Sequence, residues 1–173
     1  MEGKSRNLSS SIAALQHKDY CLIWELVKGG KLENLEAGSR AVGRLMLEHP
    51  QYQHFWEIPY PFAKIEMEKA IEGEGVNPDA HVAFEATILE QVETSDPPEA
   101  AKAYAALLEA GVGPHEARHT LARVLSEVAL KVSRMANKGQ LPNEGIYIRE
   151  LDYLAKHPVK VLSEQLRKLR KGL

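Results

Sequence analysis

A His-Glu-x-x-His sequence runs from His115 to His119 and offers recognisable metal chemistry. On a helix this spacing places both imidazoles on one face, and zinc metalloproteases use it with the glutamate activating water. Such a protease also requires a third protein ligand and normally a substrate cleft lined by a strand. The chain shows no strand-like pattern, and Glu116 falls among the charged residues of its helix. The sequence therefore disfavours the protease interpretation.

The stretch 78–93 carries a carboxylate in the middle of an apolar face. Apolar residues surround Glu85 at helical spacing, and His81 lies one turn before it. A carboxylate at such a position is costly unless it is paired, protonated or bound to a metal ion. We therefore expect Glu85 to be largely buried. Its expected partner is either a metal ion shared with His115 or His119, or the guanidinium of Arg118.

Short connections are expected to bring these two patterns together. The helices expected at 78–93, 97–110 and 114–137 reverse direction at each turn, so the first and third run side by side, parallel at their N-terminal ends. A preceding helix ends at His49-Pro50, so His49 or His54 could also reach this end. The metal ligands predicted from the sequence are His81, Glu85, His115, His119 and His54.

Imidazole and carboxylate ligands suit zinc, iron or manganese, and the sequence does not choose among these divalent metals. Glu90 and Glu116 project away from the predicted ligands, so we expect both to be exposed and dispensable for metal binding. The sequence contains no phosphate-binding loop, no glycine-rich dinucleotide turn and no Ser or Cys nucleophile motif. No nucleotide or organic cofactor is therefore expected.

A metal-free interpretation uses the same residues. Glu85 and Arg118 would form a buried ion pair, with the histidines hydrogen-bonded around it. The chain would then be an interaction or adaptor module, and the aromatic segment 52–62 would be a docking surface. The sequence leaves both interpretations open. It specifies no partner and does not say whether any reaction is catalysed.

Helices and turns must position these residues, because apolar residues recur at helical spacing along the chain. Proline and glycine mark most of the boundaries. The expected helices span about 10–28, 33–48, 62–72, 78–93, 97–110, 114–137, 142–156 and 158–171. We predict an all-α fold, a single-domain helical bundle of about six to eight helices over residues 1–173, with a core at about 8–156 and a basic C-terminal helix at 158–171.

Composition predicts a soluble globular protein. The 173 residues are 44% hydrophobic and 27% charged, with a formal net charge of −2, which gives no strong signal for nucleic acid or an anionic membrane as partner. Cys21 is the single cysteine, which excludes an internal disulfide and favours a reducing cytoplasm. No signal peptide or membrane span is expected, and a homo-oligomer remains open. His17 and His157 are expected at the surface or at helix ends.

Two blocks of the sequence, Asn77-Pro-Asp-Ala-His81-x-x-x-Glu85 and His115-Glu-Ala-Arg-His119, resemble a bacterial uncharacterised family, domain of unknown function 1841. The resemblance extends to the segments 48–54 and 142–147, and so covers about 30–155. Members of that family often carry a histidine at the position of Glu85 and an acidic residue at the position of Arg118, so this chain differs at both. Glu85 can still bind a metal ion, whereas Arg118 cannot. The resemblance implies no activity.

Overall fold

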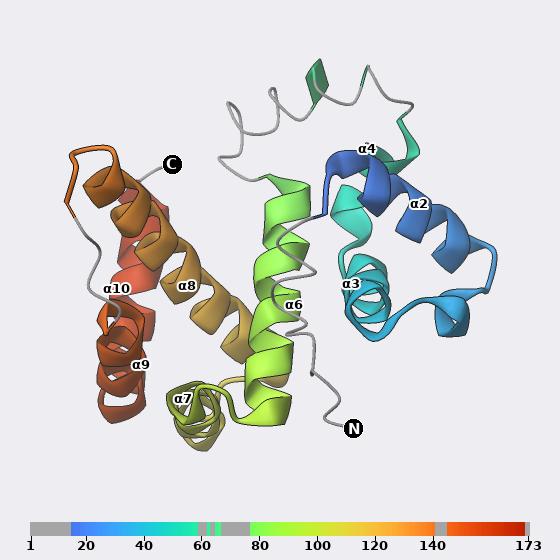
Figure 1. Cartoon of the computed structure of the whole chain (residues 1–173). Helices are drawn as coiled ribbons and strands as arrows, with labels where there is room; N and C mark the ends of the chain where they lie inside the picture. The colour runs from blue at the N-terminus through green and yellow to red at the C-terminus, as the bar shows by residue number, and fades with distance from the viewer. Residues whose placement is uncertain (1–14, 59–61, 63–64, 67–76, 141–144, 172–173) are drawn as a thin grey trace, which may run out of the picture. The chain divides into compact units, whose positions relative to one another are not determined.

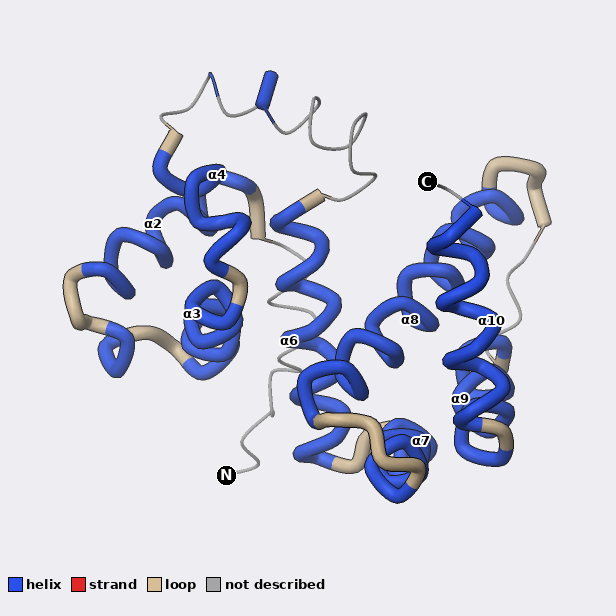
Figure 2. The backbone as a smooth tube through the Cα atoms, turned by 180° about the vertical axis from the view of Figure 1, so that it is seen from behind, coloured by secondary structure: helices blue, strands red, loops and turns tan. Residues whose placement is uncertain are grey.

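The computed structural model of the protein describes residues 15–58, 62, 65–66, 77–140 and 145–171. Helices and turns make up these residues, and none of them belongs to a strand (Figure 2). Their eight α-helices are α2 (His17–Lys28), α3 (Ala37–Glu48), α4 (Gln53–Glu57), α6 (Pro78–Thr94), α7 (Pro98–Glu109), α8 (Pro114–Ala136), α9 (Ile146–Lys156) and α10 (Pro158–Lys171), with 3-10 turns at Leu32–Asn34 and Pro50–Tyr52. The all-α prediction is confirmed, and the helix expected at 62–72 lies mostly outside the described residues.

Proline and asparagine begin the helices that carry the candidate site. Asn77 Oδ1 accepts a hydrogen bond from the backbone N–H of Ala80 at 3.1 Å, which caps the N-terminus of α6. Pro78 is the first residue of α6, where its missing N–H has no helical partner to lose. Pro98 and Pro114 begin α7 and α8 in the same way.

The chain divides into two compact units, 1–87 and 88–173, with the boundary inside α6. In the first unit, α2 packs against α3 and α4 (Figure 1). The first turns of α6 contribute to the same apolar core. Its buried members are Tyr20, Ile23, Trp24, Val27, Val42, Leu45, Met46, Tyr52, Phe55, Trp56, Val82 and Ala86. The domain limits expected from the sequence stay a prediction.

Gly43 allows α2 and α3 to approach closely. A Cβ atom at this position would lie 2.8 Å from Val27 Cγ2 and 2.9 Å from Leu32 Cδ1, shorter than real Cβ contacts. The close approach holds α3 in place, and α3 ends directly before His49. The packing of the first unit therefore fixes the position of one candidate ligand.

In the second unit, α7 packs against α8 and α9, and α10 lies beside α9 (Figure 1). The buried face of α7 carries two alanines, Ala100 and Ala103, whose small side chains permit close helix contact. Tyr147 Oη donates a hydrogen bond to Gln91 Oε1 at 2.6 Å, which joins α9 to the C-terminal part of α6. None of the helices in the described ranges has the length and apolar character needed to cross a membrane.

Candidate metal centre

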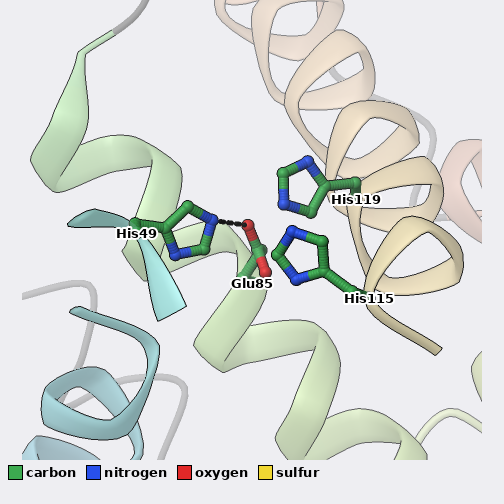
Figure 3. A group of neighbouring side chains, drawn as sticks. All are labelled: His49, Glu85, His115 and His119. Carbon is green, nitrogen blue, oxygen red and sulfur yellow. Dashed lines mark ion pairs between the residues drawn. The ribbon is translucent and has the colours of Figure 1, made fainter. Parts of the chain in front are cut away.

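Glu85 lies in the middle of α6 and is completely buried. Its Oε1 atom is 3.1 Å from His49 Nε2 and 2.9 Å from His81 Nε2. The ion pair with His49 is the dashed line in Figure 3. The predicted burial of Glu85 is therefore confirmed, and two imidazoles of its own unit contact its carboxylate. His81 reaches it because residues four apart on a helix share a face.

His49 is held in one orientation by the end of α3. It is the residue after the last helical position, its side chain is 1% exposed, and its Nδ1 donates to the Leu45 carbonyl oxygen at 2.8 Å. The ring also stacks on Tyr52, with centroids 5.9 Å apart and planes 9° from parallel. With the proton on Nδ1, the Nε2 lone pair of a neutral His49 points toward Glu85. Metal-binding histidines are commonly oriented by a carbonyl in this way.

His81 completes a triangle of ligand atoms. Its Nε2 lies 3.1 Å from His49 Nε2, and its ring meets Tyr52 edge-on with centroids 5.2 Å apart. The three atoms His49 Nε2, His81 Nε2 and Glu85 Oε1 are thus 2.9 to 3.1 Å from one another. Only two N–H protons are available for these three contacts, and each N–H can point at one partner. At most two of the contacts can therefore be hydrogen bonds, whereas one cation facing all three atoms would satisfy them together.

The edges of this triangle suit six-coordinate geometry. Neighbouring ligands of an octahedral ion with bonds of about 2.1 Å lie about 3.0 Å apart, and those of a tetrahedral ion lie about 3.4 Å apart. The observed separations of 2.9 to 3.1 Å are those of ordinary hydrogen bonds and also match the edges of one face of an octahedron. Two histidines and one carboxylate on such a face form the facial triad that holds iron(II) in non-haem sites.

The carboxylate also changes the proton affinity of its neighbour. Burial lowers the pKa of His49, but the hydrogen bond that its ring donates to Glu85, the bond to the Leu45 carbonyl and the charges of Glu85 and Glu48 outweigh it, so the pKa is raised above its usual value. In the metal-free protein this favours a proton on His49. A divalent cation would take the place of that proton, because both occupy the space between the same nitrogen and the same carboxylate.

His115 and His119 lie in the first two turns of α8, in the second unit. Their rings are tilted against each other with centroids 4.3 Å apart, as expected for residues four apart on a helix. The Arg118 guanidinium donates to His115 Nδ1 at 3.3 Å. The proton of a neutral His115 then sits on Nε2.

The other predicted residues occupy different surroundings. His54 is exposed and its ring lies over Phe55, with centroids 3.9 Å apart, so it is outside the triangle while His49 is inside it. Glu116 is exposed, as predicted. The predicted exposure of Glu90 is wrong, because this residue is half-buried. It lies on the part of α6 where the neighbouring Gln91 bonds to α9.

One family of known proteins matches this chain. A family model described as Domain of unknown function (DUF1841) matches residues 16–153, most of the chain. The comparison with curated proteins and the comparison with solved structures found no match. The resemblance seen in the sequence is confirmed.

Proposed function

The chain belongs to this family, whose description assigns no activity, and we propose from its side-chain chemistry that it binds one divalent transition-metal ion. The ligands of the proposed site are His49, His81 and Glu85. The observation that carries the proposal is the mutual separation of 2.9 to 3.1 Å among two imidazole nitrogens and one carboxylate oxygen.

His115 and His119, the two predicted ligands on α8 of the second unit, stay a prediction.

Iron(II) or manganese(II) suits this donor set better than zinc. Structural zinc sites are almost always tetrahedral, whereas a facial triad of two histidines and one carboxylate is typical of six-coordinate iron. A six-coordinate ion held by three side chains keeps positions for water or a small ligand, which is the prerequisite for catalysis at a metal.

Metal titration of the chelator-stripped protein tests the proposal. Iron(II) under anaerobic conditions, manganese(II) and zinc(II) are each added to the full chain in a calorimeter. We expect one ion per chain, and affinity in the His49→Gln variant at least about 100-fold weaker, a larger loss than removal of an outer-shell partner causes. His54→Gln is the matched control, because it removes an exposed histidine of the same unit.

The alternative is a metal-free buried polar network in an interaction module. It predicts no saturable binding of any of the three metals. Equal affinity in wild type and His49→Gln would also contradict the proposal, since it would place the bound ion on other side chains.

A further inference from the structure

Three side chains of the first unit meet where α2 approaches the beginning of α6. His17 Nδ1 lies 2.8 Å from Asp79 Oδ2, and His17 Nε2 lies 3.4 Å from Cys21 Sγ. Trp56 Nε1 donates to the second carboxylate oxygen, Asp79 Oδ1, at 2.9 Å. The Cys21 thiol therefore contacts the His17 imidazole, which in turn contacts a carboxylate that Trp56 holds in place.

The carboxylate selects the tautomer of the imidazole. Because Asp79 accepts at Nδ1, a neutral His17 carries its proton there and directs the Nε2 lone pair at the thiol of Cys21. The arrangement has a nucleophile within reach of a base, and the base is oriented by a third group. His17 is the first residue of α2, a helix end as expected from the sequence, yet its side chain is only 14% exposed.

We propose that Cys21 is a modification site that forms a mixed disulfide with small organic disulfides, with His17 transferring the proton and Asp79 orienting His17. His17 Nε2 takes the thiol proton as Cys21 Sγ attacks one sulfur of the disulfide. The new bond joins Cys21 Sγ to that sulfur, the old sulfur–sulfur bond breaks, and the departing thiolate receives the proton from His17. One disulfide and one thiol are consumed, and one mixed disulfide and one thiol are formed.

A proton acceptor is needed because the thiol does not ionise readily by itself. Burial raises the pKa of the Cys21 thiol, and the negative charges of Asp79 and Glu25 raise it further, against a backbone hydrogen bond that lowers it. The thiolate is the attacking form in disulfide exchange. Proton transfer to His17 during attack supplies that form without a free thiolate in the resting protein.

The chemistry of the site favours a disulfide over a carbonyl substrate. Attack on a carbonyl carbon develops an oxyanion that requires positioned donors, whereas exchange requires only the nucleophile and a proton for the leaving thiolate. Cys21 is partly exposed, and it is the single cysteine of the chain. No second cysteine of the same chain can release the attached group, so the mixed disulfide persists until an external thiol removes it.

The rate of reaction with oxidised glutathione tests this proposal in the reduced full-length protein. Mass spectrometry follows the mixed disulfide at neutral pH with chelator present, and the single cysteine makes the signal specific to Cys21. General acid–base catalysis contributes about 10²- to 10⁴-fold, so we expect His17→Gln to slow the reaction at least about 10-fold. Asp79→Asn should slow it less, and His157→Gln, an exposed histidine of the second unit, should not change it.

The wild-type protein provides a second comparison that needs no variant. The folded chain should react faster than the same chain unfolded in guanidinium chloride, although burial alone would make it slower. A folded rate equal to or below the unfolded rate would overturn the proposal, whether or not the His17 variant folds. An unchanged rate in folded His17→Gln would also overturn it, because the base would then be unnecessary.

Discussion

Replacing Glu85 by glutamine removes the charge of the buried carboxylate while keeping its size. In the proposed site this deletes the anionic ligand that joins His49 and His81. A metal ion present at about 100 times its dissociation constant stabilises the folded state by about 2.7 kcal/mol. One kcal/mol shifts the melting temperature of a chain of this size by about 2–4 °C. Chelator should therefore lower the melting temperature of the metal-loaded wild type by about 5–11 °C.

The same chelator should have almost no effect on Glu85→Gln, because the variant has little bound metal to lose. Differential scanning calorimetry of both proteins, with and without chelator, gives the four values required. Glu116→Gln is the matched control, since it neutralises an exposed glutamate and should keep the full chelator response. An equal chelator-induced shift in wild type and Glu85→Gln would refute the assignment of Glu85 as ligand. No shift in wild type would favour the metal-free network.

Three further predictions concern the proposed metal site and the packing of the helices within each unit. His81→Gln should weaken metal binding at least about 100-fold in calorimetric titration, and unchanged affinity would exclude this residue from the site. Tyr147→Phe should lower the free energy of unfolding by about 1 kcal/mol, because it deletes the hydrogen bond to Gln91. An unaltered denaturation midpoint would show that this hydrogen bond does not stabilise the fold. Gly43→Ala should destabilise the protein by about 1–3 kcal/mol, since its methyl group would overlap Val27 and Leu32, and a gain in stability would show that α2 and α3 can separate without cost.

The sequence predicted the burial of Glu85 because local periodicity determines which face of a helix a residue occupies. It also placed His81 one helical turn before Glu85, and the structure shows the two side chains in contact. Helical periodicity did not determine whether His49 or His54 lies beside Glu85. The 3-10 turn at Pro50–Tyr52 separates these histidines and places them in different surroundings, one buried and one exposed. The direction of such a turn depends on packing against the core rather than on residue spacing.

The cluster around His17 shows the same limit. The sequence shows that His17 and Cys21 lie four residues apart and so share one helix face. This spacing alone does not indicate a reactive thiol, because a third group must orient the imidazole. Asp79 supplies that group from a helix that begins far along the chain, and Trp56 fixes the carboxylate from α4. Contacts of this kind follow from tertiary packing. The sequence alone therefore predicted no nucleophile at Cys21.

Anomalous diffraction from crystals grown with iron(II) or manganese(II) tests the central claim most directly. Data collected on both sides of the metal absorption edge identify the element and locate it. We expect one strong peak per chain, about 2.0–2.2 Å from His49 Nε2, His81 Nε2 and a carboxylate oxygen of Glu85. A metal peak on other side chains, or no peak beside Glu85 in crystals that contain the metal, would contradict it.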